Sequence, residues 1–427
     1  MTRHHGPADR EPADHGAPQH ETPGPTTTRH ARARRDRRAW RVVALTALAA
    51  VTFTGTAALA FVARLEGNIE HVDLDPLLGP RPTQAAQEVD PAAGRARTIL
   101  LLGSDSRDGR NGAIGGRVST SMRSDTTIVL HVSADRSRVE LVSIPRDSMV
   151  SLPECTTTSG ETIPARDYRQ FNEAFARGWD HGGDLESAAA CAWRAVEATT
   201  GVVVDEFMLV DFVGFRDMVD AIDGVWICVP RDMDDDKAKL HVKAGYQRFD
   251  GPTALAFARS RGFQGNLGMD VGRIGNQQRL LAAMADRALS DDVLTDVPAL
   301  MRLLDAGTRS LTTSMGTTDI AGLARSLRGV GKGDITFLST PTVPDPDNPR
   351  NRLVWSDEAA TVWDNLARDL PVLTGTSQDP ARDRPTAGTT PPTAGATQAP
   401  TRTPARTGAT KKAGREAFTL ADETASC

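Results

Sequence analysis

Residues 123–147 read RSDTTIVLHVSADRSRVELVSIPRD, and this stretch decides the fold. Residues 126–132 and 138–144 are two runs rich in apolar and β-branched side chains, a pattern that predicts strands. The five residues between them, 133–137, are Ser, Ala, Asp, Arg and Ser, a composition typical of a turn. The stretch therefore predicts an antiparallel β-hairpin.

The chain on either side of the hairpin alternates between strand and helix patterns. Residues 98–103 (TILLLG) form a short apolar run that ends in Gly, which predicts a buried strand. Further strands are expected at 202–210, 226–229 and 335–339, helices at 183–200, 212–222, 250–259, 273–289 and 358–366, and an amphipathic pattern continues from 300 to 327. Because strands and helices interleave, we expect an α/β fold with a mixed central sheet flanked by helices.

Polar residues gather at the open end of the predicted hairpin. If the two strands pair about a turn centred on Asp135, Asp125 at the start of one strand lies opposite Pro145 at the end of the other. Arg146 and Asp147 then lie beside this pair. The hairpin is thus expected to bring an acidic and a basic side chain together at one end of the sheet.

A second carboxylate is expected at the same end of the sheet. Arg123 and Asp125 share one face of extended chain, and the strand at 98–103 leads directly into Asp105. A hard divalent cation with oxygen ligands explains why two carboxylates tolerate each other, and Mg²⁺ commonly takes one or two carboxylates together with substrate phosphate. The alternative is that Asp105 and Asp125 only satisfy backbone amides at turns and strand ends.

Arginines from two later segments are candidates for binding an anion. Arg259 and Arg261 flank Ser260 just after a predicted helix, and extended chain there would project both guanidinium groups to one side. Arg273 and Gln277 lie one turn apart near the start of the next helix. Arginine forks match phosphate oxygens, but isolated arginines at element ends are usually surface salt bridges.

The two ends of the chain differ in composition from its middle. Residues 42–62 form an uncharged apolar run long enough to cross a bilayer, and an arginine-rich segment before it predicts a cytoplasmic N-terminus. A cleaved signal peptide is the alternative, because Ala58-Leu59-Ala60 resembles a cleavage site. We expect a disordered cytoplasmic tail at 1–41, a single transmembrane helix at 42–62, a stalk at 63–97, an extracytoplasmic domain at 98–373 and a low-complexity disordered tail at 374–427.

Cysteine usage and charge limit the possible partners. Cys155 and Cys191 flank a Thr-rich loop and a predicted helix, and we expect a disulfide between them because cysteine pairs stay oxidised outside the cytoplasm. Cys228 lies in an apolar run and is expected to be a small core residue, while Cys427 has no assigned partner. A net charge of −5 with few aromatic residues gives no basic, aromatic surface of the kind that binds nucleic acid.

Seven segments carry motifs that are highly specific in combination. They read LLLGSDSR at 100–107, RSDTT at 123–127, SIPRDS at 143–148, FNEAFARG at 171–178, VDFVGFRDMVDAIDGV at 210–225, FARSR at 257–261 and DVGRIGNQQ at 270–278. With these motifs the chain resembles the LytR-CpsA-Psr family of cell-wall ligases. The family usually has Arg before the two glutamines of the last motif, where this chain has Asn276, so one outer phosphate contact or salt bridge is expected to be missing.

The resemblance implies an α/β sandwich in which an apolar pocket for a polyprenyl chain opens onto a charged mouth for pyrophosphate. It implies that Asp105 and Asp125 hold Mg²⁺, and that arginines bind the phosphates. Carried over by motif, the catalytic set is Arg123, Arg146 and Asp147, and the pyrophosphate-binding set is Arg259, Arg261, Arg273 and Gln277. The apolar residues Phe207, Val210, Phe212, Phe215 and Val219 would line the lipid pocket, although ordinary core packing predicts the same residues.

The reaction that the resemblance implies is transfer of a phosphoglycosyl polymer from a polyprenyl-pyrophosphate carrier to peptidoglycan. Two alternatives stay open. One is a pyrophosphatase that hydrolyses the lipid carrier, since the same phosphate-binding groups would serve water as acceptor. The other is a membrane-bound regulator of the kind that the family has often been labelled.

Overall fold

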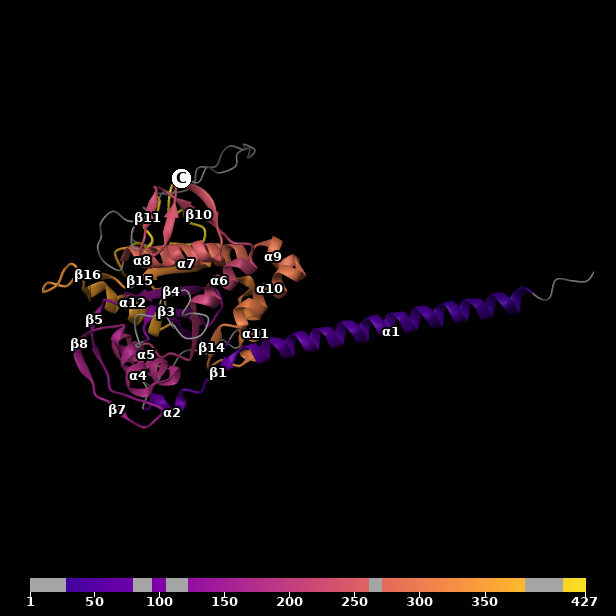
Figure 1. Ribbon diagram of the computed structural model, residues 1–427, viewed down its shortest axis with the longest axis horizontal. Helices are drawn as coiled ribbons and strands as arrows, with labels where there is room; N and C mark the ends of the chain where they lie inside the picture. The colour runs from indigo at the N-terminus through magenta and orange to yellow at the C-terminus, as the bar shows by residue number, and fades with distance from the viewer. Residues whose placement is uncertain (1–27, 80–93, 105–121, 261–270, 381–409) are drawn as a thin grey trace, which may run out of the picture. The chain divides into compact units, whose positions relative to one another are not determined.

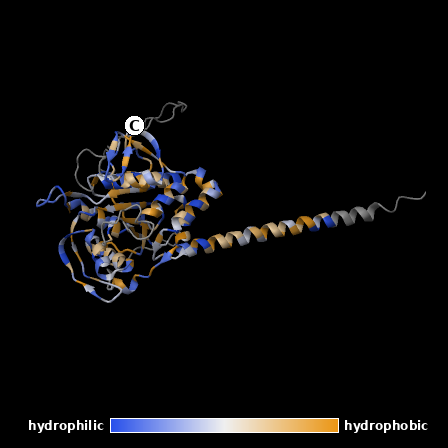
Figure 2. Ribbon diagram, viewed as in Figure 1, coloured by the Kyte–Doolittle hydropathy of each residue, from blue (hydrophilic) through white to orange (hydrophobic). Residues whose placement is uncertain are grey.

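The computed structural model describes residues 28–79, 94–104, 122–260, 271–380 and 410–427. The chain divides into two compact units, Met1–Val62 and Ala63–Cys427. The first unit holds most of α1 (Thr28–Asn68), and hydrophobic residues run along much of this helix (Figure 2). Its segment Arg38–Asn68 is the one helix in the described part of the chain that is long and apolar enough to cross a membrane, a property that an anchor and a signal sequence share.

The second unit is built on one mixed sheet of eight strands (Figure 1). In spatial order they are β1 (Glu70–His71), β14 (Leu311–Thr313), β9 (Glu206–Asp211), β2 (Arg97–Ser104), β3 (Ser124–Val132), β4 (Val139–Ile144), β15 (Ile335–Ser339) and β18 (Phe418–Thr419). Strand β3 pairs antiparallel with β2 and β4, whereas β2–β9 and β4–β15 are parallel. The predicted α/β class and mixed sheet are therefore confirmed.

The remaining elements flank or extend this sheet. The helices are α2 (Asp75–Leu78), α4 (Glu173–Gly182), α5 (Leu185–Thr200), α6 (Phe212–Ala221), α7 (Gly251–Arg259), α8 (Val271–Ala288), α9 (Asp291–Thr295), α10 (Val297–Thr308), α11 (Thr317–Ser326) and α12 (Asp357–Ala367). The small hairpins pair β5 (Met149–Leu152) with β8 (Arg166–Gln170), β6 (Cys155–Thr156) with β7 (Thr162–Ile163), β10 (Val225–Val229) with β13 (Gly245–Phe249), β11 (Met233–Asp235) with β12 (Leu240–Val242), and β16 (Thr342–Pro344) with β17 (Leu353–Trp355).

The alternation of side chains along the central strands separates two faces of the sheet. Leu100 and Leu102 of β2 belong to the main core beneath α4, α5 and α12. Leu101, between them, points to the opposite face, which α6, α7 and α8 cover. Strand β9 repeats this pattern, because Phe207 packs in the main core while Met208 faces the other side. The sheet therefore has one face packed as core and one face available for a cavity.

The hairpin at β3–β4 forms as expected, but its register differs by one residue. Val132 pairs with Val139, and the connection is a turn in which Arg136 has a φ of +59°. Residues 133–138 therefore connect the two strands, and the turn is centred between Asp135 and Arg136 and not on Asp135. The register Thr127 with Ile144 extends to place Asp125 opposite Arg146, where the sequence predicted Pro145.

The predicted stalk at 63–97 is wrong for residues 69–78, which are part of the domain. Strand β1 pairs in parallel with β14, and Leu74 and Leu78 are buried in the main core. The prolines of this segment favour a spacer, but Leu74 and Leu78 pack in the main core and so fix residues 69–78 to the domain. The domain therefore begins before residue 98.

The predicted disordered tail at 374–427 is wrong for residues 410–427. Strand β18 joins the sheet next to β15, and Phe418 stacks on Phe337 with ring centroids 5.2 Å apart. Cys427, the last residue, forms a disulfide with Cys228. The low-complexity composition of the preceding residues obscured this short apolar strand in the sequence. Strand β18 forms the edge of the sheet beside β15.

The two disulfides test the cysteine assignments. The predicted Cys155–Cys191 bond is present, with an S–S distance of 2.07 Å. The prediction that Cys228 is a core residue is wrong. In β10 the buried side chains are Val225, Ile227 and Val229, so strand alternation turns Cys228 to the other face, where Cys427 reaches it.

The C-terminal segment packs tightly on α8. The amide of Gly414 donates to Oε1 of Gln278 at 2.9 Å. Gly414 has a φ of +84°, and a Cβ there would lie 2.5 Å from the carbonyl oxygen of Val271. A Cβ on Gly275 would likewise lie 2.5 Å from the carbonyl oxygen of Ala413. Glycine is therefore needed on both sides of this contact.

We expect Gly414→Ala to lower the free energy of unfolding by at least 1–2 kcal/mol, roughly the cost of left-handed backbone for a residue with a Cβ. Gly322→Ala in α11 is the matched control, because a Cβ there meets nothing within 4 Å. The control should leave the free energy of unfolding unchanged or raise it, since Ala is more favourable than Gly in a helix interior by roughly 0.5–1 kcal/mol. Chemical denaturation of both variants checks the difference, and equal stability of the two would contradict the described contact.

Asp369, just after α12, ties that end of the chain to the β3–β4 hairpin. Its carboxylate accepts from Nε2 of His131 at 3.1 Å, the amide of Ala134 at 2.9 Å and Nη2 of Arg138 at 2.9 Å. Burial acts to raise the pKa of Asp369, but these hydrogen bonds outweigh it and hold the pKa at about 2, against an ordinary 3.8. A carboxyl with a lowered pKa stabilises the fold above its ordinary pKa and loses that contribution as pH falls toward 2.

We expect Asp369→Asn to lower the free energy of unfolding at pH 7 by about 2 kcal/mol, since a tenfold change in proton affinity is worth about 1.4 kcal/mol. Asparagine tolerates the positive φ of this position, so the change isolates the charge. The difference from wild type should shrink between pH 4 and pH 2. Asp364→Asn, in an exposed pair with Arg368, is the control and should change little.

Candidate phosphate and lipid site

A cavity of about 680 Å³ lies between the second face of the sheet and helices α6, α7 and α8. Its interior is apolar, because apolar side chains of β2, β3 and β9 line it together with those of the covering helices. The apolar lining includes Leu101, Ile128, Met208, Val210, Phe212, Phe215, Met218, Leu255, Leu280, Leu281 and Met284. Of the apolar residues expected here, Phe207 and Val219 instead belong to packed cores.

Charged side chains line the same cavity at the end of the sheet where β3 begins. Nη1 of Arg146 donates to Oδ1 of Asp125 at 2.6 Å. From α8, Nη2 of Arg273 donates to the backbone oxygen of Asp125 at 3.2 Å, and Nη1 lies 3.7 Å from Oδ2. The side chain of Arg273 is 5 % exposed, against 18 % for Arg146 and 29 % for Asp125. One carboxylate thus holds two guanidinium groups from distant parts of the sequence.

Asp147 lies behind this cluster. Its Oδ1 is 3.5 Å from Nε of Arg146 and accepts from Nε2 of Gln170 at 2.9 Å. It is not among the described residues that line the cavity. The geometry therefore gives Asp147 a role in orienting Arg146.

Arg259 and Gln277 reach the cavity from adjacent helices. Arg259 is the last residue of α7, and its guanidinium lies 5.1 Å from the centre of the Phe212 ring. Gln277 lines the cavity one helical turn after Arg273 on α8, as its spacing predicted. Ser260 is extended, with a φ of −70° and a ψ of 141°. Together these residues place donors on the helical side of the cavity.

Of the three remaining expected site residues, the structure describes only Arg123. Arg123 is exposed and is not among the described lining residues. Asp105 and Arg261 lie outside the described residues.

The structure adds polar residues that sequence reasoning missed. Asp211 and Asp235 line the cavity, together with Lys237. Asp211 also accepts from the amide of Gly214 at 2.7 Å and so caps α6, and Asp235 accepts from Ser260 at 2.9 Å. In the sequence, Asp211 comes just after the strand predicted at 202–210, as Asp105 comes just after the one at 98–103, and this position could have marked Asp211 as a candidate site residue. Nothing in the local sequence marked Asp235 or Lys237.

Two further residues of α8 have structural roles. Asn276 is fully buried, and its Nδ2 donates to the backbone oxygens of Phe257 and Ser260 at 3.3 and 3.0 Å. It therefore fixes the end of α7, where Arg259 sits. Arg279 donates to the backbone oxygen of Cys228, and burial lowers its pKa to about 10. It remains charged at neutral pH.

The charged end of the cavity offers a ligand group for a divalent cation. Asp125 is partly exposed there and offers carboxylate oxygens, the ligand type that Mg²⁺ prefers. The second expected ligand, Asp105, follows Ser104 at the end of β2, and Ser104 pairs with Ser124 beside Asp125. The described donor therefore fits a site completed by a second carboxylate, phosphate and water.

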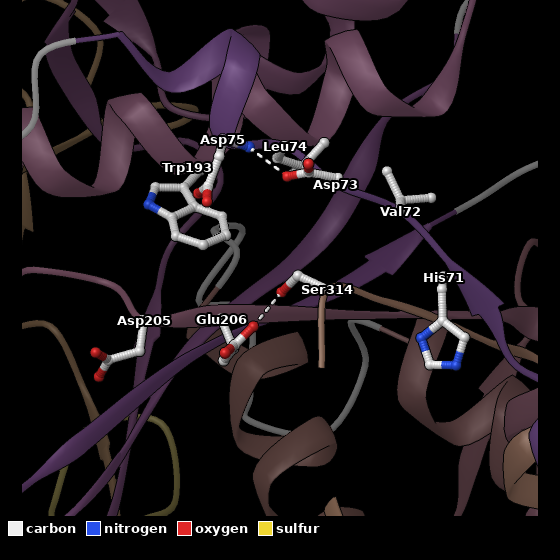
Figure 3. Close-up of a pocket in the computed structure, with 9 residues that line it drawn as sticks. All are labelled: His71, Val72, Asp73, Leu74, Asp75, Trp193, Asp205, Glu206 and Ser314. Atoms are coloured by element: carbon white, nitrogen blue, oxygen red, sulfur yellow. Dashed lines mark hydrogen bonds between the residues drawn. The ribbon is translucent and has the colours of Figure 1, made fainter. Parts of the chain in front are cut away.

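A second cavity, of about 380 Å³, lies among residues around β1, α5 and the start of β9 (Figure 3). Its described lining residues are His71, Val72, Asp73, Leu74, Asp75, Trp193, Asp205, Glu206 and Ser314, which include four carboxylates and neither Lys nor Arg. Asp205 pairs with Arg95 at 3.0 Å, and Glu206 accepts from Ser314. Its negative charge makes it unsuitable for a phosphate. The electrostatics favour the first cavity.

Comparisons with known proteins agree on one family. Residues 76–368, more than half of the chain, match the model of the LytR_cpsA_psr family. The cell wall biosynthesis protein LcpA of Corynebacterium glutamicum is 31% identical over 58% of this chain and 51% of its own length. The polyisoprenyl-teichoic acid–peptidoglycan teichoic acid transferase TagT of Bacillus subtilis is 28% identical over 66% of this chain and 79% of its own. The chain thus spans about half the length of the corynebacterial relative.

Among solved structures, TagT bound to LI-WTA is 21% identical, with a TM-score of 0.48, covering 70% of this chain and 99% of that one.

Proposed function

Because the chain belongs to the LytR-CpsA-Psr family, we propose that it transfers a phosphoglycosyl polymer from a polyprenyl-pyrophosphate carrier to peptidoglycan. Several relatives are named as transferases of polyisoprenyl-linked teichoic acid to peptidoglycan. The observation that carries the proposal is one cavity with an apolar interior and an arginine-lined end. A lipid pyrophosphate has the same division between an apolar chain and a charged group.

The apolar interior selects for the carrier chain. Each buried CH₂ contributes about 0.8 kcal/mol, so a few isoprene units supply most of the binding energy. The volume of about 680 Å³ is within the usual range of pockets for small ligands. The chain then fixes the pyrophosphate at the arginine-lined end.

The arginines serve the reaction by neutralising phosphate charge. An acceptor hydroxyl oxygen of peptidoglycan forms a bond to the phosphorus next to the glycan, the bond from this phosphorus to the bridging oxygen breaks, and lipid phosphate leaves. The hydroxyl proton passes to the departing lipid phosphate or to water as the new bond forms. Charge develops on the bridging and leaving oxygens, where Arg146, Arg273 and Arg259 supply donors. Asp147 helps to hold Arg146 in the orientation in which Arg146 also pairs with Asp125.

We further propose that Asp125, with Asp105, holds Mg²⁺. A bound Mg²⁺ would add positive charge to the pyrophosphate oxygens. The long apolar helix α1 supports a membrane anchor with the domain outside the cytoplasm, which is where peptidoglycan is found.

The test measures turnover of a short, water-soluble prenyl-pyrophosphoryl glycan by the full chain in nanodiscs, with peptidoglycan fragments and with Mg²⁺ or EDTA. We expect Arg146→Ala to lower kcat/KM by about a hundredfold or more, as for loss of a donor to developing charge. Arg368→Ala, which removes an exposed arginine from an i,i+4 pair, is the control and should match wild type. EDTA should abolish wild-type turnover.

The other outcomes decide between functions. Release of glycan phosphate into water, unchanged by acceptor, would replace transfer by hydrolysis of the carrier. Folded wild type that neither binds nor converts the lipid would contradict an enzymatic role altogether.

A further inference from the structure

Helix α10 presents an exposed apolar stripe. Val297, Met301 and Leu304 are 59%, 39% and 41% exposed, and their spacing of four and three residues places them on one face. Leu289 and Leu294, around the short helix α9, are also about half exposed. We refer to Val297, Met301 and Leu304 as the α10 stripe. Single exposed leucines are ordinary, but a contiguous apolar surface marks an interaction site.

The opposite face of α10 packs against the wall of the lipid cavity. Ala299 is buried there, and α10 contacts α6 along its length. A Cβ on Gly307 would lie 3.7 Å from Sδ of Met218, which lines the cavity from α6. The stripe and the cavity are therefore separated by two packed helices only.

A charged contact ties α10 to the end of the apolar helix α1. Nε of Arg64 lies 2.9 Å from Oδ1 of Asp305, and Nη2 lies 3.1 Å from Oδ2. Asn68 adds hydrogen bonds to Asp305 and to Thr308 at 3.2 and 3.1 Å. All four residues belong to the unit that begins at Ala63.

Chain connectivity relates this contact to the membrane. Arg64 is two residues beyond the apolar run at 42–62, and two residues span at most about 7 Å in any direction. The contact with Arg64 therefore holds Asp305 close to the membrane boundary, whatever the direction in which the span leaves the domain. Val297 lies eight residues before Asp305, about 12 Å along the helix, so the whole stripe is near that boundary.

We propose that the α10 stripe inserts into the outer surface of the lipid bilayer beside the anchor. An amphipathic helix lying in the interface buries its apolar face about 5–10 Å deep, which suits a stripe tethered through Asp305. The proposal rests on the proposed membrane anchoring. It places α10 against the membrane with the α6 wall of the cavity directly behind it, so a carrier chain has only a short distance to cover between the bilayer and the cavity.

The first test locates the stripe by fluorescence. The full chain in nanodiscs carries a bimane label on Met301→Cys, and brominated lipids replace ordinary ones as quenchers. We expect fluorescence at position 301 to fall about twofold or more on bromination, as for an interfacial depth. The control label is on Val343→Cys, which is 46% exposed in β16 and should not be quenched.

The second test separates the stripe from the reaction site. The triple variant Val297→Glu, Met301→Glu, Leu304→Glu changes only exposed side chains, and its far-UV circular dichroism and melting temperature should match wild type. We expect turnover of a long-chain carrier embedded in the nanodisc to fall about tenfold or more. Turnover of the short soluble substrate should be unchanged.

Each result has one meaning. An unquenched label, with equal turnover of both substrates by the triple variant, overturns the membrane contact and leaves the proposed function standing. Concentration-dependent dimers of wild type that the triple variant lacks, with no quenching, would also overturn it and assign the stripe to a second copy. Wild type that converts neither substrate contradicts the proposed function instead.

Discussion

The charged end of the cavity depends on Asp125, the carboxylate that Arg146 and Arg273 share. Two guanidinium groups brought to one place repel each other, and burial makes the repulsion stronger. Asp125 cancels this repulsion, so the arginines are held in place before a ligand arrives. A pyrophosphate offers more negative charge than one carboxylate and fits the same donors. The interaction that holds the two arginines together therefore also suits the site to the proposed ligand.

This arrangement requires that α8 be fixed to the sheet, because Arg273 comes from α8 and Asp125 from β3. The C-terminal segment supplies part of that fixation. Gly414 packs against the first turns of α8. Gln278 of α8 accepts a hydrogen bond from the amide of Gly414 and donates one to Ser143 of β4, so it connects the C-terminal segment to the sheet. The Cys228–Cys427 disulfide closes the segment onto β10. The last residues of the chain thus support a site whose residues, from Asp125 to Arg273, come much earlier in the sequence.

The sequence predicted the elements with strong periodicity and the residues that follow them. The hairpin, β2, α6, α7 and α8 lie within a few residues of their expected bounds. Arg146, Arg273 and Gln277 line one cavity, but their strand and helix positions alone did not predict that they converge. Strands β1, β14 and β18 have two or three residues each and carry no detectable period. The role of Asp235 and the pairing of Cys228 with Cys427 are set by contacts between distant segments. Local pattern holds no information about such contacts.

The cavity joins two requirements that conflict in most binding sites. Charged donors cost desolvation energy unless they are paired, whereas an apolar chain gains energy only where water is excluded. Here the fold resolves the conflict, because the charged residues stand at the ends of strands and helices and in the turn after β11, while most side chains from the middle of the sheet are apolar. Arg259, stacked over Phe212, marks the boundary between the two regions. A soluble phosphate or a neutral lipid would satisfy only one region, so under the proposed function a lipid pyrophosphate would be selected because it occupies both.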